Sequence, residues 1–156
     1  MVDQAIRAVV EDLLARYVHA IDDDRLEEWP GFFAPDGRYL LTTAENHAAG
    51  LPLCIIQADS PAMMVDRIAA LRHANIYEAQ TYRHVQSSLL LRALDGERVA
   101  AVSNFQVVRT MHDGAAVPFA SGRYVDRIRL PGGPCFEERL VLLDSRRVDT
   151  LLAIPI

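Results

Sequence analysis

The sequence predicts an α+β fold in which N-terminal helices pack on a curved, mostly antiparallel sheet, giving a cone-shaped domain. The second half, from Tyr82 to Leu143, holds four long blocks of strand-like pattern, separated by turn residues at 95–96, 113–114 and 131–134. Asp-Gly between such blocks is a strong hairpin signal, because Gly adopts positive φ without a Cβ clash. The blocks exceed the ordinary strand length of about 5–6 residues, so the sheet is expected to twist and curve. The first half carries helical periodicity instead.

The first helix is predicted from about Gln4 to Ile21, with Asp3 accepting hydrogen bonds from the free amides of the first turn. Its apolar residues recur at spacings of three and four and form one face: Ile6, Val10, Leu13, Leu14, Tyr17, Val18 and Ile21. Asp24 and Glu27 resemble a capping box, which predicts a second, short helix.

An aromatic cluster of Trp29, Phe32 and Phe33 follows. We expect residues 35–37, Pro-Asp-Gly, to form a turn and residues 38–43 to form a short strand. This part of the chain would therefore lead from the helices into the sheet.

Residues 45–52 read as a loop and residues 53–56 as a brief strand. Ser60 before a proline is a helix start, because the hydroxyl caps the helix and proline tolerates the first helical position. A third helix is therefore expected over 61–74, ended by Asn75 in a left-handed conformation.

Length and composition fit a single domain over residues 1–156, with 51% hydrophobic and 24% charged residues. The net charge of −5 argues against a nucleic-acid partner. No apolar run approaches the roughly 18 residues that span a bilayer, and no signal pattern begins the chain, so we expect a cytoplasmic protein without membrane contact. Cys54 and Cys135 are expected to be reduced core residues, and the apolar segment 148–156 is expected to pack on the domain.

Five residues are candidates for an interface or a pocket. Tyr82 and His84 share one face of the first long strand, and Arg83 lies on the other. His84 is either a hydrogen-bonded structural residue, which we favour, or an acid/base group at the mouth of the cone. Asp66 and Arg67 on the third helix are expected to form a surface or interface charge pair.

Two further groups allow a functional interpretation. A carboxylate within 22–24 could supply a base, although solvated turn residues are expected there, and Tyr17, Tyr39 and His84 could line a cavity or simply fill the core. The cysteines lack the paired spacing of a Rieske centre, and the histidines are scattered along the chain, at positions 19, 47, 73, 84 and 112. We therefore expect no catalytic residue, cofactor or metal in this chain.

Short segments along nearly the whole chain carry a family resemblance. They are WPGFF (29–33), NHAAGL (46–51), ADS (58–60), DRIAALR (66–72), ANIYE (74–78), YRH (82–84), RTMH (109–112), FASGRY (119–124), ER (138–139), DS (144–145) and DTLL (149–152). This ordered series resembles the small (β) subunit of bacterial aromatic-ring-hydroxylating dioxygenases, most closely the terephthalate dioxygenase type. The predicted architecture is also similar to that of ketosteroid isomerase, scytalone dehydratase and nuclear transport factor, a fold that hosts enzymes and non-enzymes alike.

The resemblance implies a large (α) partner subunit that carries a Rieske iron–sulfur cluster and a mononuclear iron and performs the chemistry. It implies that this chain is a non-catalytic structural subunit, forming a homotrimer within a three-plus-three hexamer. The assembly, an oxidoreductase of aromatic compound catabolism, would add both atoms of oxygen to an aromatic ring. The alternative is a stand-alone lyase or isomerase of the same fold with a small apolar pocket. A neighbouring large-subunit gene would favour the first hypothesis, and a buried carboxylate–His pair facing an open cavity the second.

Overall fold

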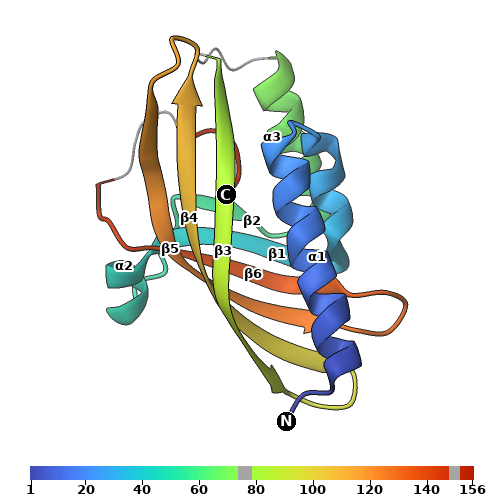
Figure 1. Cartoon of the computed structure of the whole chain (residues 1–156). Helices are drawn as coiled ribbons and strands as arrows, with labels where there is room; N and C mark the ends of the chain where they lie inside the picture. The colour runs from blue at the N-terminus through green and yellow to red at the C-terminus, as the bar shows by residue number, and fades with distance from the viewer. Residues whose placement is uncertain (74–78, 148–151) are drawn as a thin grey trace.

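The computed structural model describes residues 1–73, 79–147 and 152–156. Helical elements occupy most of the first half, and long strands fill the second (Figure 1). In chain order the elements are α1 (Gln4–Asp22), the 3-10 helix η1 (Leu26–Phe32), β1 (Phe33–Thr43), α2 (Ala44–Ala48), β2 (Ile56–Ala58), α3 (Pro61–His73), β3 (Gln80–Ala93), β4 (Arg98–Met111), β5 (Ala116–Arg129) and β6 (Cys135–Leu143).

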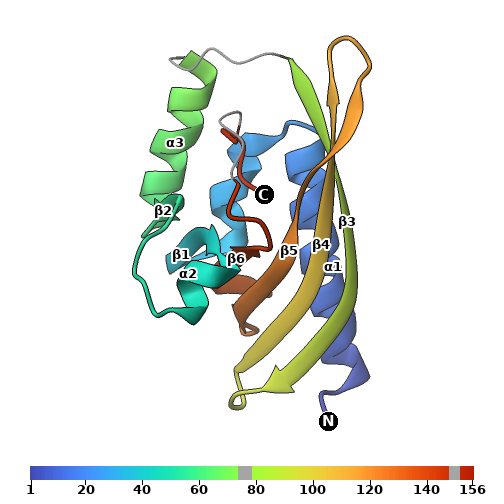
Figure 2. The ribbon, with the colours of Figure 1, turned by 90° about the vertical axis from the view of Figure 1, so that its left-hand side faces the viewer.

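The strands form one six-stranded sheet in the order β2-β1-β6-β5-β4-β3. Neighbouring strands are antiparallel except β1 and β6, which run parallel. The sheet curves strongly between its β1–β6 part and its β3–β5 part, and the described C-terminal residues lie between that curve and the helices (Figure 2). The predicted α+β class, with helices on a curved and mostly antiparallel sheet, is confirmed.

The prediction for α1 is also confirmed. The side chain of Asp3 accepts a hydrogen bond from the backbone N–H of Ala5 at 3.2 Å, which satisfies one free amide of the first turn. The predicted apolar face is turned to the core, where its most buried members include Val10, Leu13 and Tyr17. The helix ends at Asp22, one residue later than expected.

The predicted capping box is wrong. The short helix η1 is a 3-10 helix that starts after Arg25, and no side chain caps it. Asp24 has a left-handed backbone, with φ of 58°, and its carboxylate accepts a hydrogen bond from Arg72 Nη1 at 2.9 Å. Glu27 accepts one from Arg72 Nε at 2.8 Å. Both acids therefore bind a cation from α3 and do not form the reciprocal contacts of a capping box.

Three boundaries in the middle of the chain also differ from the prediction. The turn expected at 35–37 is wrong, because β1 begins at Phe33, before the predicted start at 38, and runs through these residues with a register irregularity between Phe33 and Arg38. The expected loop contains α2, which begins after Thr43, whose hydroxyl caps it by accepting a hydrogen bond from the backbone of Asn46 at 3.1 Å. The strand expected at 53–56 lies at Ile56–Ala58.

The start of α3 agrees with the prediction, since Ser60 Oγ accepts a hydrogen bond from the Met63 amide at 3.3 Å. Its predicted end at residues 74–75 lies outside the described residues. Both cysteines are free, as expected, but they are only partly buried, so their predicted place in the core is wrong. Ile154 and Ile156 are buried, which confirms packing for the described part of the C-terminal segment.

Candidate functional site

A buried acid–imidazole pair joins the end of α1 to β3. His84 Nδ1 lies 2.5 Å from Asp22 Oδ1, and the backbone N–H of His84 donates to Asp22 Oδ2 at 2.8 Å. The side chains are 0% and 3% exposed, respectively. His84 is thus buried and hydrogen-bonded, as the structural interpretation expects, while the prediction of solvated turn residues at 22–24 is wrong for Asp22.

A pocket of about 300 Å³ lies beside this pair and is lined by Asp22, Gln80, Tyr82 and Ile154 among others. A carboxylate that orients an imidazole is a common general-base arrangement, and in the part of the chain that the structure describes His84 Nε2 has no hydrogen-bond partner. A carboxylate–His pair that faces an open cavity would favour a lyase or isomerase, but His84 is not among the residues that line this pocket. The imidazole itself remains enclosed behind the pocket wall, because none of its side-chain surface is exposed.

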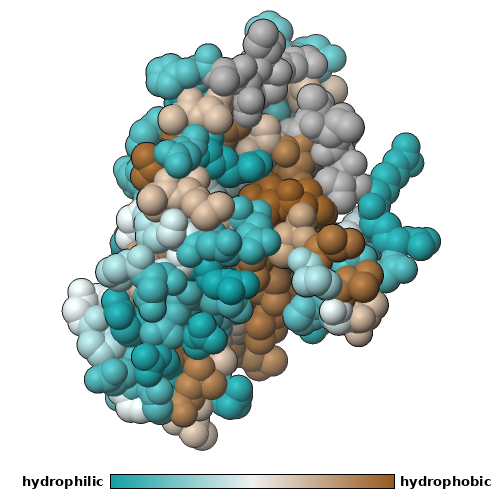
Figure 3. Space-filling model, turned by 180° about the vertical axis from the view of Figure 1, so that it is seen from behind, coloured by the Kyte–Doolittle hydropathy of each residue, from teal (hydrophilic) through white to brown (hydrophobic). Residues whose placement is uncertain are grey.

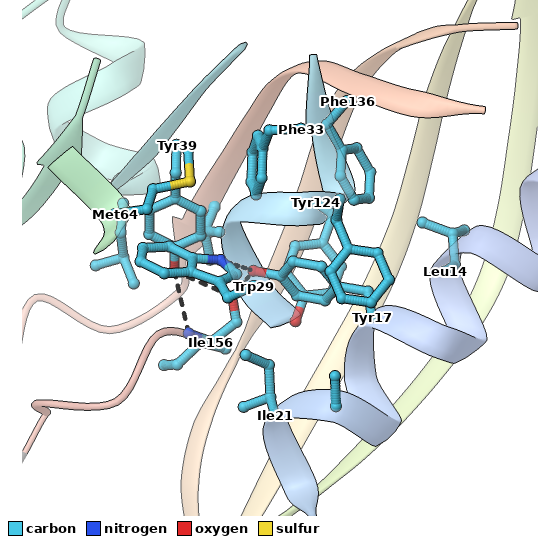
Figure 4. Close-up of a cluster of buried hydrophobic side chains, with 14 of the residues drawn as sticks. Leu14, Tyr17, Ile21, Trp29, Phe33, Tyr39, Met64, Tyr124, Phe136 and Ile156 are labelled. Atoms are coloured by element: carbon cyan, nitrogen blue, oxygen red, sulfur yellow. Dashed lines mark hydrogen bonds between the residues drawn. The ribbon is translucent and has the colours of Figure 1, made fainter. Parts of the chain in front are cut away.

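The interior of the cone is filled by aromatic side chains and by Ile156 (Figure 4). Trp29 Nε1 donates to Tyr17 Oη at 3.1 Å, and Tyr39 Oη both donates to the Ile156 carbonyl at 3.0 Å and accepts from the Ile156 amide at 3.1 Å. Burial raises the pKa of Tyr17 to about 12, so this phenol stays neutral. Tyr17 and Tyr39 therefore fill the core and do not line an open cavity, which were the two interpretations that the sequence allowed.

A second buried charge pair was not recognised in the sequence. Arg139 is 0% exposed, and its guanidinium carbon lies 3.7 Å from the ring centroid of Tyr124 and 4.1 Å from that of Tyr17. Asp126, its cross-strand neighbour on β5, places Oδ1 3.7 Å from Arg139 Nε. Burial raises the pKa of Asp126 to about 7, although Arg139 acts to lower it.

Two observations could have revealed this pair. Asp126 follows Tyr124 at the period of two that marks one face of a strand. Arg139 lies in the last strand, two residues before the apolar Val141 on the same face. Neither observation shows that the two charges meet, because their pairing depends on strand register.

The remaining candidates do not form a common site. Asp66 is exposed, and Arg67 Nη2 donates to the Ala153 carbonyl at 3.4 Å. The predicted charge pair is therefore wrong, because consecutive helix residues do not face each other. Burial lowers the pKa of Arg67. Tyr82 is buried against Phe119, with ring centroids 5.2 Å apart, and Arg83 is exposed on the opposite face of β3.

Within residues 1–73, 79–147 and 152–156, no group of three or more His, Cys, Asp or Glu side chains is placed to hold a metal ion. In the same part of the chain, none of the helices has both the length and the apolar character needed to cross a membrane.

Comparison with known proteins gives the family. Residues 4–134 match the model of the SnoaL-like domain. The chain is 42% identical, over 91% of its length and 93% of the relative, to the terephthalate 1,2-dioxygenase terminal oxygenase component subunit beta 1 of a Comamonas species. It is 41% identical to the anthranilate 1,2-dioxygenase small subunit of Burkholderia cepacia, over 90% of this chain and 88% of that one.

A solved structure from Novosphingobium aromaticivorans, described as the β subunit of an aromatic-ring-hydroxylating dioxygenase, has a TM-score of 0.90 and 36% identity, and the match covers 98% of both chains. Similarity of this extent includes every element from α1 to β6. The chain therefore belongs to the SnoaL-like domain family and, within it, to the small (β) subunits of aromatic-ring-hydroxylating dioxygenases.

Proposed function

We propose that this chain supports the large subunit of a ring-hydroxylating dioxygenase and contributes no group to the reaction. The relatives are named as β or small subunits of such enzymes, one of them explicitly within a terminal oxygenase component. The large subunit would hold the Rieske cluster and the mononuclear iron. We further propose that three copies of each subunit form the complex and that the complex is cytoplasmic.

The observation that carries this proposal is the double contact of Asp22. One carboxylate oxygen accepts from the His84 backbone and the other binds the His84 ring, so both oxygens hold α1 against β3. A general base instead needs an atom within hydrogen-bond reach of a substrate proton. The imidazole is fully enclosed, and the cone interior beside it is occupied by aromatic rings and by Ile156. These contacts support a role for the pair in holding the fold together.

An exposed apolar surface supports assembly with other chains. Hydrophobic side chains gather in a band on the face shown in Figure 3. The segment that runs past β2 into α3 contributes several apolar side chains that are 41–64% exposed, namely Leu51, Leu53, Ile55, Met63 and Val65. Monomeric proteins rarely expose large contiguous apolar areas, so we infer that the assembled complex covers some of these side chains.

We predict that the purified chain is an iron-free trimer. Light scattering at micromolar concentration should give about three times the 17.4 kDa mass of one chain, and metal analysis of the same sample should find no stoichiometric iron. Co-expression with the neighbouring large-subunit gene should yield a complex that contains both chains. A species of 17 kDa alone would contradict the trimer, and about one iron per chain that is lost on His84→Ala would contradict the assignment of iron to the partner.

A further inference from the structure

A groove of about 440 Å³ lies between α1 and the middle of β3, and Asp22 and His84 do not line it. Leu14 and Val18 of α1 and Leu89 of β3 provide apolar walls, while Gln86 and Ser103 contribute polar groups. Ser103 is only 3% exposed, so it lies at the base of the groove. The volume is in the range of small-molecule sites, about 300–1,000 Å³.

The groove coincides with a bulge in β3. Ser87 pairs with Asn104 and Leu90 pairs with Val102, so two residues of β3 stand opposite Ser103 alone. One of the two, Ser88, has a φ of +58°, a left-handed conformation that side-chain-bearing residues rarely adopt. Bulges and strained residues of this kind are frequent beside functional sites.

Two buried polar atoms in the groove have no hydrogen-bond partner among the described residues: Gln86 Nε2 and Ser103 Oγ. Gln86 pairs with Phe105, two residues beyond Ser103 on the same face of the sheet, so the two residues are diagonal neighbours. Backbone positions in that relation are about 7–8 Å apart, which leaves room for one group between the side chains. Because buried polar groups in folded proteins are nearly always hydrogen-bonded, these two atoms are available to a bound ligand or to ordered water.

We propose that this groove binds a small, uncharged ring compound that carries a hydroxyl group. The hydroxyl oxygen accepts a hydrogen bond from Gln86 Nε2, and its hydrogen is donated to Ser103 Oγ, while the ring lies against the apolar walls. At the rim, Arg7 and Glu11 pair with each other at 3.1 Å, so together they offer a ligand no net charge. Gln86 is half-buried and unbranched, so rotation of its side chain gives the ligand access to both polar atoms.

Saturation-transfer NMR titration of the purified full chain with phenol and with toluene tests this proposal. The two compounds have the same shape and differ in the hydroxyl group. Phenol should bind, and toluene should bind at least about fivefold more weakly. Ser103→Ala should weaken the binding of phenol about 5- to 100-fold, the usual effect of leaving one buried hydrogen-bonding group without its partner. Ala15→Trp, at an exposed α1 position on the groove, should abolish binding by filling it.

Ser121→Ala is the matched control, because Ser121 lies on β5, outside the groove, and its Oγ donates to Asp144. This variant should bind phenol as the wild type does, and melting curves establish that all variants are folded. Absence of phenol binding to the wild type would overturn the proposal and assign the two polar atoms to ordered water. Equal binding of toluene, or phenol binding that survives Ala15→Trp in a folded protein, would overturn it as well.

Discussion

Replacing Arg139 with Met is expected to lower the free energy of unfolding by about 3–5 kcal/mol at pH 8, because it leaves the buried Asp126 without its partner charge. Met keeps much of the side-chain volume, so the decrease in the free energy of unfolding is caused by the missing charge more than by a cavity. Urea unfolding of the full chain gives the measurement, read as the change in midpoint at constant slope.

The dependence of this loss on pH is a sharper test. In the wild type, the pKa of Asp126 is raised from 3.8 to about 7, so the carboxyl group holds a proton more readily in the folded state than in the unfolded state. Proton binding by Asp126 therefore makes its full contribution to the free energy of unfolding below about pH 3.8. This contribution is lost as the pH rises to about 7. Arg139 lowers this pKa, so Arg139→Met should raise it further and extend the loss of stability above pH 7.

Two comparisons separate charge from packing. Arg16→Met removes an exposed arginine that pairs with Asp12 four residues away, and it should change stability little. Adding Asp126→Leu to Arg139→Met removes both buried charges and should recover most of the loss at pH 8. An Arg139→Met variant that unfolds at the wild-type midpoint at both pH 5 and pH 8 would contradict this account of the pair.

Gly122→Ala should also destabilise the chain strongly, by at least the upper end of the about 1–3 kcal/mol that overpacking usually costs. A Cβ at position 122 would lie 1.9 Å from the carbonyl oxygen of Leu142 on the neighbouring strand. This oxygen belongs to the backbone, so relief requires β5 and β6 to separate. Gly96→Ala is the control, because nothing lies within 4 Å of its Cβ, and equal unfolding midpoints for the two variants would show that the sheet absorbs the extra methyl group.

The sequence predicted the large features of the fold because their signals are local. Asp-Gly pairs and long alternating blocks place β3 to β6 within a few residues, and apolar spacing with Asp3 places α1. The errors arise where a distant residue binds a side chain for which the local sequence pattern predicts a local contact. Asp24 and Glu27 have the spacing of a capping box, but Arg72, 45 or more residues away, binds both carboxylates.

The site was predicted less completely for the same reason. His84 was singled out by its place in the first long strand, yet its partner Asp22 is 62 residues away and looked like one of three solvated acids. The Asp126–Arg139 pair depends on the register between β5 and β6, which composition and periodicity do not reveal. Function came from the ordered family resemblance, because the fold hosts enzymes and non-enzymes alike.

The claim that this subunit supports the oxygenase without joining the chemistry is tested most directly by His84→Gln in the assembled complex. Gln keeps a hydrogen-bonding side chain of similar reach opposite Asp22 and removes the titratable ring. Specific activity and the content of the proposed hexamer, by light scattering, are measured on one sample, with Asp22→Asn as a second variant. We expect turnover within a few-fold of the wild type wherever the hexamer is intact, and activity that falls only in proportion to any loss of hexamer. A general acid/base role would be worth about 100- to 10,000-fold, so a hundredfold loss with the hexamer intact would contradict the claim.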